Sequence, residues 1–552
     1  MRFQEGSVGH DWNKALISTD FRNVNEQGEI GLDKFVRDRV RRICQELFMP
    51  DLFEVLTGVS SLLEYRDFGF GYDLNLKYQL ARIFNSAAPE GEEVDLFTGK
   101  VTSGRIEKTT RLQHEWVTTM YILEFMLEST KYGSQYTKAE WRSAALLGLL
   151  HDTLHPNGSH GGERAIAELA KIAGGDLIFW QEWLRAFGLE IYAGANLEVF
   201  GKTPEEREKY RSHDSMMLFE MSDEKSGIRT ILEAHGVRGE IIELLKQQLA
   251  GKGLGEILDY CDTFAYLDLD HVDDKGYPFT FPNGQGILEG LLSSIYYQNG
   301  PGWQFVPTND SENSAARSVV EQTLALRARM TRETYKSTRN SIHEAMLQKM
   351  TVMGLLLGQV TLWDIFSGGD VSLLDKLSRF AAIFKRYKRN GKTDTLGPVI
   401  DYFYRNAILG KSDFQARWMA IPQDELSFIL GNFSLKYDKA GVLSGIRLAS
   451  GKELELADAL SLAVFNGVRR HSPDLRSVAS RGAFVVIPPV SATSKKIFIG
   501  KTVCMADRRL VYGDPRNFLV AIANPEKSKE RDLVFDSIKE SVLDLPAILR
   551  NY

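Results

Sequence analysis

The sequence predicts a mainly α-helical protein with a small α/β lobe at its C-terminal end. Up to about residue 470, apolar residues recur at the three- and four-residue spacing of helices with one buried face. Beyond about residue 480, the pattern changes to short β-branched runs separated by Pro, Gly, Asp and Asn, namely AFVVIPPV, KIFIG, RRLVYG and FLVAIA. A last helix is expected over 531–549.

The segments with helical spacing are 34–49, 109–130, 139–152, 163–173, 240–250, 255–270, 314–335 and 341–358. Gly and Pro clusters between them mark the connections. These patterns divide the chain into four regions: an N-terminal helical extension (1–100), a central core (101–275), a helical region that completes the core or forms an oligomer interface (276–475), and the α/β lobe (476–552).

Composition excludes several classes of protein. The chain has 552 residues, of which 43% are hydrophobic and 25% charged, as in ordinary globular proteins. Its net charge of −6 gives no general attraction to DNA or to acidic membranes, so neither nucleic acid nor a membrane is expected as a partner.

Cysteine content and hydropathy indicate a compartment. Cys44, Cys261 and Cys504 lie far apart, which argues against a disulfide framework or a zinc ribbon. The first residues lack the apolar core of a secretory signal, and no apolar run approaches the roughly 20 residues that span a bilayer. A soluble cytoplasmic protein is expected.

Histidine carries the most informative pattern. Of ten histidines, four lie between residues 114 and 160. His151 and Asp152 end the helix AALLGLL, whose apolar character on every side predicts burial. Burying such groups is costly unless hydrogen bonds or a metal ion compensate them. A hydrogen-bonded core pair and a metal-bound pair both fit this one occurrence.

Other polar side chains surround this pair in the sequence. Arg111 and His114 lie on the preceding helix, with His114 on its apolar stripe. Further candidates follow in HDTLHPNGSHGGE and ILDYCDTFAYLDLD: His155, His160, Glu163, Asp259, Asp262, Tyr266 and Asp270. The last three lie four residues apart, on one helical face. Two imidazoles and two carboxylates suit one divalent ion per chain, Mn²⁺, Fe²⁺, Zn²⁺ or Mg²⁺.

The order R-x-x-H, HD, H-P-x-x-x-H-x-x-E and D-x-x-x-Y-x-x-x-D resembles the HD-domain superfamily over about residues 105–271. More narrowly, it resembles the deoxynucleoside triphosphate triphosphohydrolases. The resemblance implies an HD-domain helical core over 101–275. It also implies four metal ligands, with Asp259 as the alternative to the last of them: His114, His151, Asp152 and Asp262.

The resemblance also implies roles around the metal. Arg111 would grip phosphate, and His155 and His160 would line a phosphate channel. His160 would be the acid toward the leaving oxygen, oriented by Glu163. Three more residues would bind substrate: Tyr266 packing on the sugar, Asp270 accepting its 3′-hydroxyl, and His213 near the triphosphate.

The sequence departs from the family pattern in two places. Thr153 and Leu154 separate the HD pair from His155, and the loop HPNGSHGGE lacks the second proline and the aromatic residue that are common there. The stretch 76–104 offers no match to the family's base-recognising residues.

The predicted function is therefore metal-dependent hydrolysis of (deoxy)nucleoside triphosphates to nucleoside and triphosphate, by attack of a metal-activated water on the α-phosphorus. The alternatives are an HD-type phosphomonoesterase, a cyclic-nucleotide phosphodiesterase, or a regulatory protein that senses nucleotides without turnover. The resemblance further implies a homo-oligomer with a nucleotide effector.

Overall fold

The fold is seen in a computed structural model of the chain. The residues it describes are 31–64, 111–224, 226–270, 279–299, 303–308, 313–330, 338–366, 369–386, 396–409, 414–420, 433–437, 443–448, 450–470, 483–487, 496–499, 502–505, 517–523, 528–550 and 552. The expected extension over 1–100 is thus described only in part, and the stretch 76–104 lies outside the described residues.

Helices make up most of the described chain, which confirms the predicted fold class. The first half contains α2 (Gly31–Glu46), α3 (Pro50–Glu64), α5 (Arg111–Lys131), α6 (Lys138–Leu150), α7 (Ser159–Gly174), α8 (Ile178–Phe187), α9 (Glu190–Leu197), α10 (Pro204–Glu208), α11 (His213–Ser222), α12 (Gly227–Ala234), α13 (Gly239–Leu249) and α14 (Gly255–Asp270). The second half contains α15 (Ile287–Ser294), α16 (Asn313–Met330), α17 (Thr338–Leu356), α18 (Leu362–Phe366), α19 (Gly369–Arg386), α20 (Gly397–Ala407), α22 (Leu456–Arg470), α23 (Ser528–Leu543) and α24 (Leu545–Leu549).

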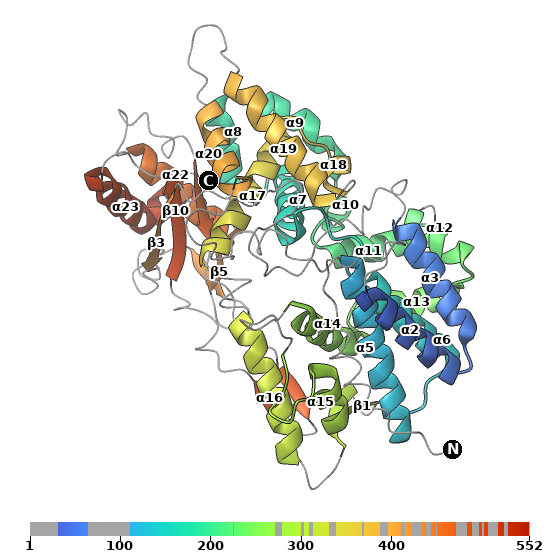
Figure 1. Cartoon of the computed structure of the whole chain (residues 1–552). Helices are drawn as coiled ribbons and strands as arrows, with labels where there is room; N and C mark the ends of the chain where they lie inside the picture. The colour runs from blue at the N-terminus through green and yellow to red at the C-terminus, as the bar shows by residue number, and fades with distance from the viewer. Residues whose placement is uncertain are drawn as a thin grey trace.

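Helix α5 lies at the centre of the helical core, where it packs against α2, α6 and α14 (Figure 1). It is buried on all sides over most of its length, and its buried residues include polar as well as apolar ones. Its buried Glu124 accepts a hydrogen bond of 2.9 Å from Arg39 Nη2 of α2, which compensates the charge. Helix α6 begins in a capping box formed by Thr137 and Glu140 and is then apolar up to the His151–Asp152 pair.

The strands form small sheets whose members come from distant parts of the chain. The strands are β1 (Ile295–Asn299), β2 (Trp303–Pro307), β3 (Phe414–Ala420), β4 (Ser434–Tyr437), β5 (Leu443–Arg447), β6 (Glu453–Glu455), β7 (Phe484–Ile487), β8 (Lys496–Ile499), β9 (Thr502–Met505) and β10 (Asn517–Ala523). Their orders are β1-β2-β8-β9, β3-β10-β7 and β4-β5-β6. All described pairs are antiparallel except β2 with β8.

This topology adds strands to the stretch 276–475, which was expected to be mostly helical. Strands β1 to β6 lie inside that stretch, and two strand pairs cross the expected boundary at residue 476, since β3 pairs with β10 and β2 with β8. Strand pairing across so many residues depends on tertiary contacts, and the short strands have little periodicity of their own. The lobe therefore begins earlier in the chain than its β-branched runs indicated.

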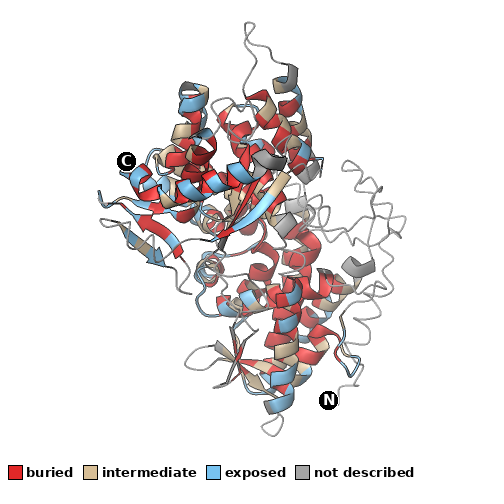
Figure 2. Ribbon diagram, turned by 90° about the vertical axis from the view of Figure 1, so that its left-hand side faces the viewer, coloured by how far each residue is buried: buried red, intermediate tan, exposed pale blue. Residues whose placement is uncertain are grey.

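Figure 2 shows that buried residues follow the inner sides of the helices, and Phe518 to Ile522 of β10 are buried as well. Trp180 and Trp183 are among the largest fully buried side chains, as expected for core residues. No helix among the described residues combines the length and the apolar character needed to cross a membrane. Most of the basic run at 385–392 lies outside the described residues.

Candidate metal centre

Three packed helices bring the predicted ligands together. His114 lies in the first turn of α5, His151 and Asp152 directly follow α6, and Asp262 lies in the middle of α14. Helices α5, α6 and α14 contact one another pairwise, so residues up to 148 positions apart in the chain meet at one point. His114 is fully buried, and His151 and Asp152 are nearly so.

The ligand atoms of His114, His151 and Asp152 lie close together, and Asp262 contacts both histidines of this group. His114 Nε2 is 2.8 Å from Asp262 Oδ1 and 4.0 Å from Asp152 Oδ2. His151 Nε2 is 3.6 Å from Asp262 Oδ1 and 3.9 Å from Asp152 Oδ1. His114, His151 and Asp152 form one of the groups of the described residues whose ligand atoms all lie within 4.8 Å of one another.

The hydrogen bonding of His151 tests whether a cation fits. Its Nδ1–H donates to the carbonyl oxygen of Gly148 at 2.8 Å, which leaves Nε2 as the nitrogen that carries the lone pair. Nε2 is buried and has no hydrogen-bond partner among the described residues. A metal-ligating histidine has this arrangement, with one ring nitrogen held by a backbone carbonyl and the other directed at the ion. The donor set fits a divalent cation.

Asp259 and Asp262 were the two candidates for the fourth ligand. Asp262 Oδ1 is 2.8 Å from His114 Nε2. Asp259 lies about one helical turn earlier on α14 and lines a cavity that adjoins the four residues. Asp262 contacts His114 and His151, and its role as the fourth ligand stays a prediction.

Arg111 lies at the same cavity but contacts a proposed ligand. Its Nη1 donates to Asp152 Oδ2 at 2.8 Å, and its Nη2 donates to Ser159 Oγ at 3.1 Å. The side chain is buried. Arg111 therefore orients Asp152 as well as adding positive charge to the cavity wall.

A second cluster of polar side chains adjoins the first one. His155 follows the HD pair in a turn, whereas His160 and Glu163 lie in the first turns of α7 and His213 begins α11. Glu163 Oε1 accepts from the backbone N–H of His213 at 3.0 Å and lies 2.9 Å from its Nδ1, while Glu163 Oε2 is 3.2 Å from His160 Nδ1. The rings of His155 and His213 stack with centroids 4.3 Å apart.

These contacts move the pKa values of the cluster. Burial alone would raise the pKa of Glu163, but hydrogen bonds from His160 and His213 hold it well below its usual range. Burial would lower the pKa of His213, yet Glu163, Asp214 and Asp152 raise it to about 9. Burial lowers the pKa of His155, as do its cationic neighbours Arg111 and His213.

The structure brings most of the predicted site residues to one cavity, of about 360 Å³. The residues that line it are Arg111, His151, Asp152, His155, Ser159, His160, His213, Asp214, Gln248, Leu249, Gly251, Gly255, Leu258, Asp259 and Asp262. A neighbouring cavity of about 450 Å³ shares Gly251, Gly255 and Asp259 with it and is otherwise lined by Glu256, Tyr260, Gln304 and Phe305. The polar site therefore continues into a partly aromatic space.

Two predicted substrate residues are not among those lining the cavity. Tyr266 is buried one turn beyond Asp262, and its hydroxyl accepts a hydrogen bond of 2.8 Å from Arg327 Nε of α16. Asp270 is the last residue of α14, and its side chain lies outside the described residues.

Several residues that line the cavity at the candidate metal centre were not predicted from the sequence. Asp214 follows His213 directly, and its proximity to a predicted residue was the available signal. Gln248 and Gly251 come from the end of α13 and the turn after it, where no polar motif marks them. Only the packing of α13 against α6 and α14 brings them to the site.

No protein-family model and no curated protein matches this chain. Among solved structures, the chain is similar to a phosphohydrolase from Bacteroides thetaiotaomicron, at 12% sequence identity and with a TM-score of 0.42. The similarity covers 81% of this chain and 94% of that one. The inference about chemistry therefore rests on the side chains of the site.

Proposed function

We propose that the protein is a metal-dependent phosphohydrolase that hydrolyses (deoxy)nucleoside triphosphates to nucleoside and triphosphate. The observation that carries the proposal is the set of two imidazole nitrogens and two carboxylates, from His114, His151, Asp152 and Asp262, at the edge of a cavity lined by further histidines and an arginine. This donor set suits Mn²⁺, Fe²⁺, Zn²⁺ or Mg²⁺.

The residues around the metal position support a phosphorylated substrate. A divalent cation held there supplies polarisation of a phosphoryl oxygen and a water molecule of lowered pKa. Arg111, His155, His160 and His213 provide positive charge or hydrogen-bond donors on the same wall. Glu163 holds His160 and His213 in place, and it maintains a protonated His213 at neutral pH.

The number of possible phosphate partners on this wall favours a polyphosphate over a single phosphate. One phosphate group needs fewer partners than the four that Arg111 and the three histidines offer. We assign His160 as the acid toward the leaving oxygen, since its side chain is partly exposed to the cavity and is oriented by Glu163. The neighbouring cavity with Tyr260 and Phe305 has room for a base and sugar, because small-molecule sites typically have volumes of about 300–1,000 Å³.

The experiment is to incubate the purified chain with Mn²⁺ and each nucleoside triphosphate in turn and to separate the products by chromatography. Nucleoside plus triphosphate is the expected result. Monophosphate plus pyrophosphate, or turnover of p-nitrophenyl phosphate alone, would refute the proposed reaction. Nucleotide binding without any turnover, unchanged by His151→Ala, would support a sensor in its place.

A further inference from the structure

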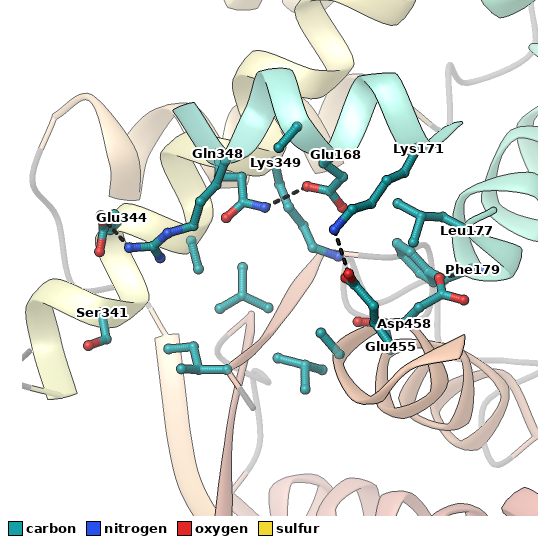
Figure 3. A pocket seen from close by; sticks show the side chains of 18 residues that line it. Glu168, Lys171, Leu177, Phe179, Ser341, Glu344, Gln348, Lys349, Glu455 and Asp458 are labelled. Atoms are coloured by element: carbon teal, nitrogen blue, oxygen red, sulfur yellow. Dashed lines mark hydrogen bonds and ion pairs between the residues drawn. The ribbon is translucent and has the colours of Figure 1, made fainter. Parts of the chain in front are cut away.

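A third cavity, of about 420 Å³, lies between the helical body and the C-terminal lobe. Its walls come from α7, α17, β7 and the start of α22, together with Leu177 and Phe179 at the start of α8. No residue that lines it also lines the cavity at the metal centre. We call it the Lys349 cavity, after the residue that distinguishes it. Figure 3 shows the Lys349 side chain running away from α17 toward Phe179.

Lys349 is a buried ammonium group without a hydrogen-bond acceptor. Lys349 is 8% exposed, and its Nζ has no hydrogen-bond partner among the described residues. Instead, Nζ lies over aromatic rings, 4.1 Å from the centroid of Phe179, 4.7 Å from that of Phe484 and 5.5 Å from that of Trp180. Ring faces stabilise the charge but accept no conventional hydrogen bonds. A buried polar group in this state requires an explanation.

The carboxylates of the cavity are already hydrogen-bonded to other groups. Glu168 accepts from Trp180 Nε1 and, at 2.6 Å, from Gln348 Nε2. Asp458 accepts hydrogen bonds from the backbone N–H groups of Ile178, at 2.9 Å, and Phe179, at 3.0 Å.

At the rim of the cavity, two more carboxylates pair with cations. Glu344 accepts from Arg164 at 2.9 Å, and Glu455 accepts from Lys171 at 2.5 Å (Figure 3). Lys349 thus has carboxylate charge nearby but lacks an oxygen atom at hydrogen-bonding distance.

The remaining lining defines the rest of the ligand. It is mainly apolar, with Ala167, Leu177, Ala345, Ala457, Val485 and Ile487. Four carboxylates and three cations line the cavity, so an additional anion would be repelled more than it is attracted. The missing group is an uncharged oxygen acceptor on an apolar body.

We propose that the Lys349 cavity is a second ligand site, which binds a small, uncharged, apolar molecule through a carbonyl oxygen that accepts hydrogen bonds from Lys349 Nζ. The volume lies within the typical range for small-molecule sites. The site is independent of the proposed hydrolysis at the metal centre.

The protonation state of Lys349 makes its amine reactive enough to be labelled. Burial lowers the pKa of its ammonium, and the negative charges of Glu168 and Asp458 raise it. Burial has the larger effect, so the pKa is about 8. An appreciable fraction of the side chain is therefore the neutral amine near pH 7.5, whereas an exposed lysine is almost wholly protonated. The neutral amine reacts with aldehydes.

The first experiment traps a carbonyl compound on the full chain. The protein is treated with 3-phenylpropanal and cyanoborohydride at pH 7.5, and the labelled lysines are mapped by mass spectrometry of peptides. The amine adds to the carbonyl carbon, the carbonyl oxygen leaves as water, and hydride from cyanoborohydride reduces the imine to a secondary amine. Lys349 should be labelled at least tenfold faster than Lys171, which lines the same cavity but is paired and more exposed.

The competing ligands decide which chemistry the site accepts. The uncharged ketone 4-phenylbutan-2-one should protect Lys349 from labelling, whereas the anion 3-phenylpropanoate should protect at least tenfold less well. Labelling of Lys349 no faster than that of Lys171, the absence of protection by the ketone, or stronger protection by the anion would each overturn the proposal.

A matched pair of variants gives an independent measurement. Calorimetric titration with 4-phenylbutan-2-one should show at least a tenfold loss of affinity for Lys349→Met and less than a twofold change for Lys171→Met. Equal affinity of Lys349→Met and the unsubstituted chain would overturn the proposal. Should Lys349→Met fail to fold, protection of the unsubstituted chain still decides the question.

Discussion

Replacing Lys349 by Met should stabilise the protein at neutral pH, because this buried ammonium has no hydrogen-bond acceptor within the described part of the chain. Met is unbranched like the lysine side chain and can pack against Phe179 and Phe484 without a charge. Burial lowers the pKa of Lys349 from 10.5 to about 8. A shift of this size corresponds to roughly 3 kcal/mol, at about 1.4 kcal/mol per pH unit.

The sign of this effect depends on pH. Below pH 8, both the folded and the unfolded chain carry the protonated lysine, so the full penalty acts on the folded state. Between about pH 8 and 10.5 the unfolded chain binds more protons than the folded chain, and the stability of the native protein rises with pH. The advantage of Lys349→Met should therefore be largest at pH 7 and should largely disappear near pH 10.5.

The assay is differential scanning calorimetry of both chains at pH 7 and pH 10.5. The full penalty of roughly 3 kcal/mol corresponds to a Tm higher by roughly 6–12 °C for Lys349→Met at pH 7, since ~1 kcal/mol moves the Tm of a domain of 150–250 residues by about 2–4 °C. Lys171→Met serves as the control and should change little, because its partly exposed pair with Glu455 contributes about 0–1 kcal/mol. Lys349→Met less stable than the native chain at pH 7, or a difference independent of pH, would refute the reasoning.

The other predictions concern the metal centre. Asp262→Asn should reduce the metal content per chain to near zero in elemental analysis after dialysis, while Asp259→Asn should leave it unchanged; the opposite result would assign the fourth ligand to Asp259. Arg111→Met should weaken metal binding about 10–100-fold in a competition titration with a chelator, because it releases Asp152. Glu163→Gln should lower kcat about a hundredfold without loss of metal, because the side chain loses its negative charge and one of the two oxygens that contact His160 and His213 becomes a donor; an unchanged kcat would contradict that role. EDTA should abolish hydrolysis and Mn²⁺ should restore it. Activity that persists in a protein shown to be metal-free after EDTA treatment would exclude the proposed chemistry.

Much of the candidate site could be expected from the sequence because its residues occur in local patterns. His114 lies on the apolar stripe of a helix, and His151 and Asp152 end a helix that is apolar all round. His155, His160 and Glu163 follow within one turn and the start of the next helix. What the sequence left open was the choice between Asp259 and Asp262, since both lie on α14 and only the position of α5 against that helix distinguishes them.

Residues that act through distant packing could not be expected in the same way. Lys349 lies in a segment with clear helical spacing, but nothing near it in the chain indicates that Phe179 and Phe484 enclose its amine. Tyr266 was expected beside the sugar, and its contact with Arg327 depends on the position of α16.

Sequence by itself determined the helical class of this protein and indicated most polar residues of its candidate metal centre, because helical periodicity and short motifs are properties of neighbouring residues. Tertiary structure alone decided the pairing of β3 with β10 and of β2 with β8, the contact of Asp262 with His114, and the burial of Lys349. The physical reason is that each of these depends on surfaces more than 80 residues apart in the chain, whose contact is set by the packing of the whole core.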